Sequence, residues 1–391
     1  MKAMKYDFDR LTDRRGTYSY KWEVAEGELP MWVADMDFET APEIKKALVK
    51  RAEHGIFGYS TTPDEFFEAV SGYFERRHGF KIPTEWMVYS NGIVAAISSI
   101  VRKFTTPNEQ VLIQAPVYNV FYNSILNNGR RVLSSDLIYK DGAYSVDYED
   151  LERKLADPET TLMILCNPHN PVGKLWTREE LVRLGELCKK HGVTVVSDEI
   201  HCDFVDTGLA YVPFASASEV CADICVSLVS GSKTFNIAGL QSACVYAKNP
   251  HLRHRVYRGL NTDEVGEPNA FSMAANIAAF SSCDDWVRAL NEYIWGNKHF
   301  AQEYIEKNVP SLKVVRSQAT YLLWVDVSAV TSCSTEFAKE LRTLTGLYIS
   351  SGAGYGECGG SFIRINMATQ RERVLDGLER LKHGVELIGK K

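Results

Sequence analysis

The sequence predicts an α/β protein with a large domain, built on a mostly parallel sheet covered by helices on both faces, and a smaller α+β domain. Two observations lead to this fold class. In the middle of the chain, short and almost continuously apolar runs alternate with amphipathic stretches, as strands covered on both faces do. Near the C-terminus, helices and strands follow each other in a mixed α+β order. We expect residues 1–45 to form an N-terminal arm and part of the small domain, 46–289 the large domain and 290–391 the small domain.

Five strands are expected in the large domain, because five short runs are rich in β-branched residues: 111–114, 161–166, 193–197, 224–229 and 243–247. A helix is expected between the second and third runs. Thr177 and Glu180 form a capping box at its start, and Gly192 ends it. A strand, a helix and a strand in succession make a βαβ unit, which predicts parallel neighbours.

The C-terminal part predicts a long helix over 286–309, which ends near Pro310. After it we expect a strand over 321–327, a helix over 334–345, a strand over 362–366 and a final helix from about Arg371. The first forty or so residues contain Trp/Tyr-rich patches but little periodicity. They are expected to form an arm that packs on another part of the molecule or on a second copy of it.

Composition excludes several classes of protein. The chain has 391 residues, a net charge of −6, 45% hydrophobic and 24% charged residues, which is typical of a globular protein and not of a disordered one. Its mixed charges argue against binding to nucleic acid. An apolar stretch of about 20 residues is missing and the N-terminus is polar, so neither a membrane span nor a secretory signal is expected. The nine cysteines are odd in number and contain no C-x-x-C pair, which favours reduced thiols in a cytoplasmic protein over disulfides or a metal site.

Four polar segments follow expected strands or begin a helix, and ligands bind at the carboxyl edge of such sheets. The first is Ser230-Gly231-Ser232-Lys233, directly after the strand over 224–229. Burial lowers the pKa of a lysine and makes its amine a nucleophile that can form a Schiff base, and serine hydroxyls suit a phosphate group. Taken alone, the segment favours the simpler alternative of a solvated lysine in a strand-end turn.

The second and third segments offer an acid and an amide. Asp198 follows the strand over 193–197 and could pair with a protonated ring nitrogen, while His201 lies three residues further on. A helix N-cap and a satisfied polar side chain are equally good explanations of these two residues. Asn170 begins the second of two Asn-Pro pairs that force a rigid turn, and its amide could bind a phenolic oxygen. Plain turn chemistry would explain it as well.

The fourth segment begins at Ser90, and its Gly92 opens a helix that runs to about Phe104. Free N–H groups at a helix start bind phosphate, although a lone glycine is a weak signal. A lysine, a buried acid, an amide and such a helix start together fit one ligand, pyridoxal phosphate. Tyr118, which follows the strand over 111–114, could cover the face of its ring.

The order of these residues and the gaps between them resemble the fold-type I pyridoxal-phosphate enzymes, the class I/II aminotransferase superfamily. The gap is 28 residues from Asn170 to Asp198 and 35 residues from Asp198 to Lys233, and the resemblance extends over nearly the whole chain. The segments PMWVADMDF, DEIH and SKTFNIAGL, which begin at residues 30, 198 and 232, resemble more narrowly the cystathionine β-lyase (C–S lyase) subgroup. This subgroup includes the maltose-regulon lyase and cystalysin. The resemblance implies an aspartate-aminotransferase-like fold, with the cofactor in the large domain.

The resemblance also implies a role for each residue around the cofactor. Lys233 corresponds to the lysine that carries the cofactor, and Asp198 to the acid on its ring nitrogen. Asn170 corresponds to the amide on its phenolic oxygen, His201 stands near the same oxygen, and Tyr118 corresponds to the stacking aromatic. Lys233, Asp198 and Tyr118 are the expected catalytic residues.

Phosphate and substrate contacts are implied in the same way. The phosphate contacts correspond to the N–H groups of Ile93 and Val94, to the side chains of Ser230 and Ser232, and to Tyr59 donated by a second subunit. A homodimer is therefore implied. Arg364 corresponds to the arginine that binds the α-carboxylate of a small amino-acid substrate, and Asp35 is expected to contact the substrate too.

The implied activity is cleavage of cystathionine or a related cysteine S-conjugate to pyruvate, ammonia and a thiol. Gln241 stands where aspartate-type aminotransferases carry an arginine, which favours the lyase subgroup. Against it, residues 92–96 read GIVAA where the lyases tend to read GVVPA. An aminotransferase and a lyase with a second role as a regulatory binding protein remain alternatives. A nicotinamide-dependent enzyme is disfavoured, because the G-x-G-x-G at 352–356 lies in the last domain and not after a first strand.

Overall fold

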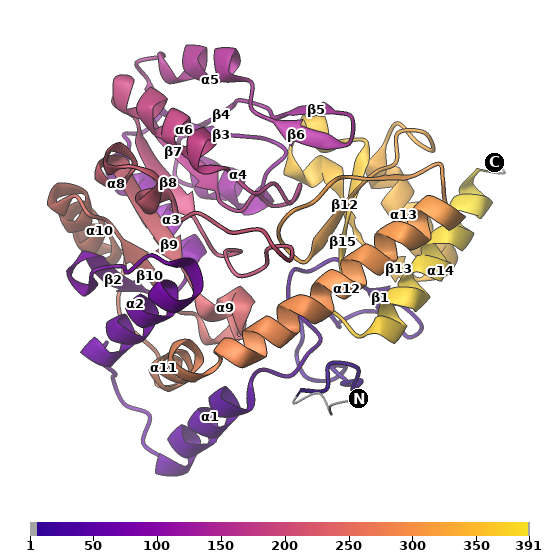
Figure 1. Ribbon diagram of the computed structural model, residues 1–391, viewed down its shortest axis with the longest axis horizontal. Helices are drawn as coiled ribbons and strands as arrows, with labels where there is room; N and C mark the ends of the chain where they lie inside the picture. Colours follow the sequence, from indigo (N-terminus) through magenta and orange to yellow (C-terminus); the bar gives the residue numbers. More distant parts are fainter. Residues whose placement is uncertain (1–5, 390–391) are drawn as a thin grey trace.

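Two main sheets with helices packed on them, together with two short two-stranded pairs, make up the structure (Figure 1), a computed structural model that describes residues 6–389. The larger sheet has seven strands. In spatial order they are β2 (Met87–Ser90), β10 (Ala243–Tyr246), β9 (Cys225–Val229), β8 (Thr194–Asp198), β7 (Thr160–Cys166), β3 (Gln110–Ile113) and β4 (Arg131–Ser134). All neighbours are parallel except at β10, which is antiparallel to both β2 and β9.

Both faces of this sheet are covered, because its central strands place apolar side chains on both of them. In β7, Leu162 and Ile164 belong to one buried cluster, whereas Met163 and Leu165 belong to the other. The first face packs against α3 (Ile93–Phe104), α4 (Asn119–Leu126) and α10 (Pro250–Thr262). The opposite face packs against α2 (Asp64–His78), α5 (Tyr148–Leu155), α6 (Arg178–Lys190), α8 (Glu219–Ile224) and α11 (Ser272–Ser282). The predicted fold class is therefore confirmed.

The predicted capping box begins α6. The Thr177 hydroxyl accepts a hydrogen bond from the Glu180 N–H at 3.2 Å, and the Glu180 carboxylate accepts one from the Thr177 N–H at 2.9 Å. The antiparallel direction of β10 has a local cause. The residues between β9 and β10 form two single-turn helices at the sheet edge, α9 (Gly231–Thr234) and η2 (Ala238–Leu240). Because no helix crosses the face of the sheet there, the chain returns beside β9 in the opposite direction.

The smaller sheet has four antiparallel strands in the order β11 (Lys313–Val314), β12 (Leu322–Asp326), β15 (Phe362–Asn366) and β14 (Ser350–Ser351). Three helices share its core: α12 (Asp284–Asn308), α13 (Ser334–Thr345) and α14 (Arg371–Ile388). The predicted ranges of α13 and β15 agree with the structure residue for residue.

The long helix α12 connects the two cores (Figure 1). Its first turns bury Trp286 and Leu290 with the large sheet, and its last turns bury Ala301 and Ile305 with the small one. The expected boundary at residue 290 therefore falls inside one continuous helix.

The N-terminal arm packs on the smaller sheet. Trp22, Leu29 and Met31 belong to that core, and β1 (Leu29–Pro30) pairs in parallel with β13 (Leu347–Tyr348). After the arm, α1 (Pro42–His54) packs on α11, and a short hairpin of β5 (Ile138–Lys140) and β6 (Ala143–Ser145) lies beside the smaller sheet (Figure 1). Within residues 6–389, no helix is long and apolar enough to cross a membrane. The nine cysteines are free thiols, and seven of them are buried.

Candidate active site

A cavity of about 310 Å³ lies at the carboxyl edge of the large sheet. Its lining contains eight of the predicted site residues: Ile93, Val94, Tyr118, Asn170, Asp198, His201, Ser232 and Lys233. The sheet explains this convergence. Parallel pairing places Cys166 beside Asp198 and Asp198 beside Leu228, so that the ends of β7, β8 and β9 meet. β2 runs in the same direction as β9, since β10 is antiparallel to both, and it brings Gly92 to the same edge.

Lys233 lies in the single turn α9, directly after β9. Ser230 caps this turn: its hydroxyl oxygen accepts a hydrogen bond from the Ser232 N–H at 3.1 Å and the hydroxyl donates to the Ser242 carbonyl at 2.6 Å. Ser230 therefore supports the turn from behind, and Ser232 is the serine that lines the cavity. Position 231 needs glycine, because a Cβ there would lie 2.9 Å from the Phe235 ring.

The Lys233 amine is desolvated in the cavity. Its Nζ donates a hydrogen bond to the Ala34 carbonyl at 2.6 Å. Desolvation lowers the pKa of Lys233 to about 8, although the nearby carboxylate of Asp35 opposes the shift. An amine with this pKa is partly neutral near neutral pH and can act as a nucleophile or a base.

Asp198 ends β8 and is 3% exposed. Its Oδ1 accepts a hydrogen bond from the Ile200 N–H at 3.1 Å. Burial raises the pKa of this carboxyl to about 7, despite that N–H and the charge of Lys233. A buried acid in this state is stabilised as a carboxylate by a cationic partner, such as a protonated ring nitrogen.

His201 and Asn170 lie on the adjoining wall of the cavity. Burial and the charge of Lys233 lower the pKa of His201 to about 3, so its imidazole is neutral. Within residues 6–389, nothing forms a hydrogen bond with its Nδ1. The backbone N–H of Asn170 donates a hydrogen bond to the Cys166 sulfur at 3.4 Å. Burial holds the pKa of the Cys166 thiol well above its usual value. Cys166 therefore supports the turn as an unreactive thiol.

The start of α3 and the ring of Tyr118 complete the cavity. Gly92 precedes the helix with φ of 141°, a conformation that L side chains rarely adopt, and the first N–H groups of a helix have no partner within it. Tyr118 precedes α4, and its ring packs edge-on against Phe121 with the centroids 5.7 Å apart. Burial raises the pKa of the Tyr118 phenol to about 12, so the phenol is neutral.

Four predicted site residues do not line the cavity: Ser230, Tyr59, Arg364 and Asp35. Tyr59 lies between α1 and α2 and is fully exposed. Arg364, in the middle of β15, is 5% exposed and donates to the Trp32 carbonyl at 3.0 Å and to the Asn170 side-chain oxygen at 3.2 Å. Its guanidinium also lies 4.8 Å from the centre of the Tyr355 ring. Arg364 thus adjoins the cavity through Asn170.

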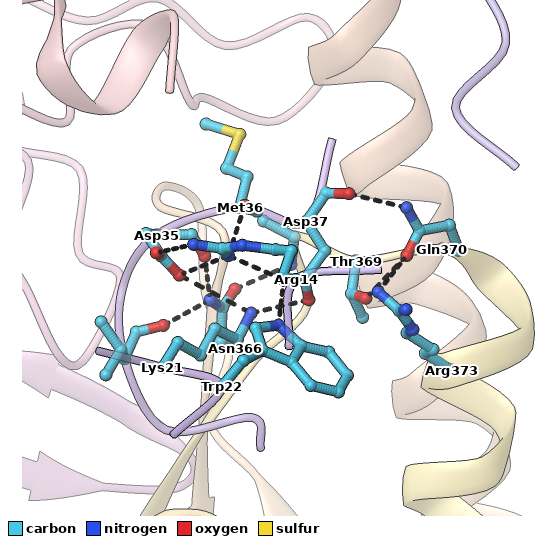
Figure 2. A network of polar contacts seen from close by, with 12 residues as sticks. Arg14, Lys21, Trp22, Asp35, Met36, Asp37, Asn366, Thr369, Gln370 and Arg373 are labelled. Carbon is cyan, nitrogen blue, oxygen red and sulfur yellow. Dashed lines mark hydrogen bonds and ion pairs between the residues drawn. The ribbon is translucent and has the colours of Figure 1, made fainter. Parts of the chain in front are cut away.

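The Asp35 carboxylate is already paired. It accepts hydrogen bonds from both terminal nitrogens of Arg14, at 2.7 and 3.3 Å (Figure 2). What the same segment presents to the cavity is the backbone of Ala34. The structure thus shows a backbone acceptor that the side-chain pattern did not predict, although it lies within the segment PMWVADMDF.

Asp203 supports the lysine turn from the side away from the cavity and was also not predicted. It accepts a hydrogen bond from the Thr234 hydroxyl at 2.7 Å, and its other oxygen lies 3.2 Å from His78 Nε2 and 3.6 Å from Arg77 Nε. Burial alone would raise the pKa of Asp203, but these two partners hold it well below its usual value. Cys202 joins His78 and Asp203 in a group that could hold a metal ion. The guanidinium of Arg77 already supplies the positive charge there.

Comparison with known proteins agrees with this geometry. Residues 29–381 match the family model for aminotransferases of class I and II. Cystathionine beta-lyase PatB of Bacillus subtilis is 43% identical over 383 residues, which cover 96% of this chain and 99% of PatB.

Two solved structures superpose closely. Cystalysin from Treponema denticola, which contains a pyridoxal 5′-phosphate cofactor, has a TM-score of 0.94 and 31% identity over 98% of this chain and 99% of its own. A pyridoxal-phosphate-bound C–S lyase from Staphylococcus hominis has a TM-score of 0.92 and 33% identity over the same shares. The family match over most of the length and these similarities show that the chain belongs to the class I and II aminotransferase family.

Proposed function

We propose that this protein is a pyridoxal-phosphate-dependent carbon–sulfur lyase that cleaves cystathionine or a related cysteine S-conjugate to pyruvate, ammonia and a thiol. The observation that carries the proposal is the meeting of Lys233, Asp198 and Asn170 in one cavity, in a chain that resembles enzymes named as lyases over almost its full length. Gln241, which lines the same cavity, supports the lyase over an aspartate-type aminotransferase.

The residues present fit pyridoxal phosphate. The Nδ1 of His201 is buried without a partner among the described residues, and such an atom is costly unless a ligand satisfies it. Asp198 would hold the ring nitrogen, and Asn170 and His201 the phenolic oxygen. Tyr118 would cover the ring, and the start of α3 would bind the phosphate together with Ser232. A volume of about 310 Å³ is at the lower end of the range for small-molecule sites.

The chain's own residues supply proton transfer and orientation. Bound pyridoxal phosphate supplies an electron sink for the negative charge that develops at the substrate Cα. Asp198 would keep the ring nitrogen of the cofactor protonated, since a cation beside a buried acid favours the ionised form of that acid. Lys233 Nζ, as a free amine, would remove the substrate Cα proton and return a proton to the departing sulfur. Arg364 binds the α-carboxylate and turns the Cα–H bond toward Lys233.

The proposal includes a homodimer in which Tyr59 reaches the phosphate of the neighbouring subunit. In support of it, Ile56, Phe57 and Tyr59 are all exposed on one short connection, and soluble monomers rarely expose such a group of large apolar side chains.

A substrate panel tests the function. The protein, loaded with pyridoxal phosphate, is expected to release pyruvate from cystathionine, cysteine, cystine and an aryl-cysteine conjugate without any keto-acid acceptor. Pyruvate is measured with a coupled lactate dehydrogenase assay. Turnover that requires a keto acid, with transfer of the amino group to it, would instead identify an aminotransferase.

Replacing Arg364 by lysine is expected to lower kcat/KM by about tenfold to a hundredfold, mainly by raising KM. Lysine keeps the positive charge but cannot form the bidentate hydrogen bond of a guanidinium to a carboxylate. Steady-state kinetics with cystathionine measure this effect. The matched control is Arg380→Lys on α14, whose guanidinium pairs with Asp376 and the Gly27 carbonyl. An unchanged KM in Arg364→Lys would remove Arg364 from the substrate site.

A further inference from the structure

The carbonyl oxygen of Ala34 accepts two hydrogen bonds from two distant parts of the chain. Lys233 Nζ donates to it at 2.6 Å, and the Tyr321 hydroxyl donates to it at 2.8 Å. A carbonyl oxygen has two lone pairs, so these two donors use its full capacity. Tyr321 is fully buried, directly before β12 of the smaller sheet, while Lys233 lies in α9, directly after β9 of the larger sheet.

The segment that presents this carbonyl is held on both sides. The Asn366 side-chain amide donates to the carbonyls of Val33 and Asp35, each at 2.6 Å, so the peptide groups next to the Ala34 carbonyl are fixed by β15. The Asn236 side chain pairs with both the N–H and the carbonyl of Met36, at 3.1 and 3.0 Å.

A buried ion cluster anchors the same segment to the rest of the arm. Figure 2 shows Arg14 and Lys21 lying between the carboxylates of Asp35 and Asp37. Lys21 Nζ lies 2.8 Å from Asp37, and the Trp22 indole N–H donates to the same carboxylate at 2.8 Å. With side chains on either side of it fixed in this way, the Ala34 carbonyl has little freedom to follow a moving amine.

The ring of Tyr321 is fixed as firmly as the carbonyl that it binds. It packs edge-on against Phe204, with the centroids 4.8 Å apart, and against His201 at 5.6 Å. The hydroxyl therefore points in one direction. Because burial and the charge of Asp35 hold the pKa of Tyr321 well above its usual value, the hydroxyl always carries the proton that it donates.

We propose that Tyr321 is a positioning residue for Lys233: its hydroxyl fixes the Ala34 carbonyl as the acceptor that holds the free Lys233 amine in place while substrate is bound. This rests on the proposed function only in requiring Lys233 to remove the Cα proton. Proton transfer is slower when an amine on a flexible four-carbon chain occupies many positions, and a fixed acceptor restricts the amine to one of them. Tyr321 touches neither substrate nor cofactor in this account and acts through Ala34.

Tyr321→Phe tests the proposal, because it removes only the hydroxyl. The holoenzyme is given L-alanine in deuterium oxide, and loss of the Cα–H signal is followed by proton NMR. Alanine has no leaving group on Cβ, so the exchange needs Lys233 but not carbon–sulfur cleavage. The exchange kcat is expected to fall about threefold to tenfold, the range of one hydrogen bond, while the KM for alanine stays within about twofold. Crystal structures with bound alanine are expected to show Lys233 Nζ on the Ala34 carbonyl in the wild type and away from it in the variant.

Tyr144→Phe is the matched control. Its hydroxyl is also buried, and it accepts a hydrogen bond from the Trp324 indole N–H at 3.1 Å, outside the cavity. This variant is expected to lose stability but to keep the wild-type exchange kcat. Equal losses of kcat in the two variants, an unchanged kcat in Tyr321→Phe, or a loss confined to KM would overturn the proposal. A wild-type protein that exchanges alanine but releases no pyruvate from cystathionine would refute the lyase and leave the result for Tyr321 standing.

Discussion

Replacing Lys233 by alanine is expected to abolish pyruvate release from every member of the substrate panel and to remove the yellow colour that a lysine-bound cofactor gives the protein. Lys233 is the one lysine among the described residues that line the cavity, so no neighbouring amine can replace it as nucleophile or as base. Activity assays and visible absorbance spectra of the purified variant measure the two effects together.

Two controls separate the possible causes of such a loss. Lys233→Arg keeps a positive charge beside Asp198 but has no nucleophilic amine, and it is expected to be as inactive as the alanine variant. Lys248→Ala, which removes a half-exposed lysine paired with Glu219, is expected to retain full activity. A Lys233→Ala protein that stays yellow and active would refute the assignment of the cavity.

Replacing Asp37 by alanine is expected to lower the free energy of unfolding by about 3–5 kcal/mol, because it breaks a buried ion cluster and leaves cations behind. The side chains of Asp37 and Lys21 are each only 1% exposed, and Arg14 and the Trp22 indole would lose the same acceptor. Urea denaturation at neutral pH, followed by tryptophan fluorescence, measures the loss. The exposed pair of Glu39 and Lys45 supplies the control, since Glu39→Ala is expected to cost less than about 1 kcal/mol. A loss of that small size in Asp37→Ala would show that the cluster adds no stability.

The same cluster predicts a dependence of stability on pH. Burial alone would raise the pKa of Asp37, but Lys21, Trp22 and Arg14 together lower it below the usual value. A carboxyl whose pKa is lower in the folded protein stabilises the fold fully above its unfolded pKa of about 3.9, and the contribution is lost as the pH falls toward the folded value. The difference in stability between the wild type and Asp37→Ala is therefore expected to shrink in acid.

The strands and helices that the sequence predicted well are those with strong local signals. The apolar runs of β7, β8 and β9, the capping box of α6 and the periodic helix α13 all depend on neighbours within a few residues. The edge strands β2 and β4 were not predicted. Each has only four residues, and none of the four in β4 is buried, so the apolar signal is short in both strands and weak in β4.

The candidate site, too, contains residues that the sequence predicts and residues that it does not. The sequence alone predicts that residues at the ends of parallel strands lie close together, because the pairing of such strands places their carboxyl ends at one edge of the sheet. The hydrogen-bond acceptor of Lys233 could not be predicted from the sequence, since it is a backbone carbonyl and every residue has one. The second donor to that carbonyl, Tyr321, could not be predicted either, because it lies 287 residues from Ala34 along the chain.

The packing of the arm on the smaller sheet has a consequence for the order of events during synthesis. Trp22, Leu29 and Met31 leave the ribosome early, yet the strands and helices that bury them, β12, α13, β15 and α14, are translated last. The strands of the larger sheet all lie between residues 87 and 246. This sheet can therefore form while these three apolar side chains are still exposed to solvent. A nascent chain that stops short of α14 therefore exposes an apolar N-terminal segment. This segment must fold late or be bound by a chaperone before the arm can place the Ala34 carbonyl beside Lys233.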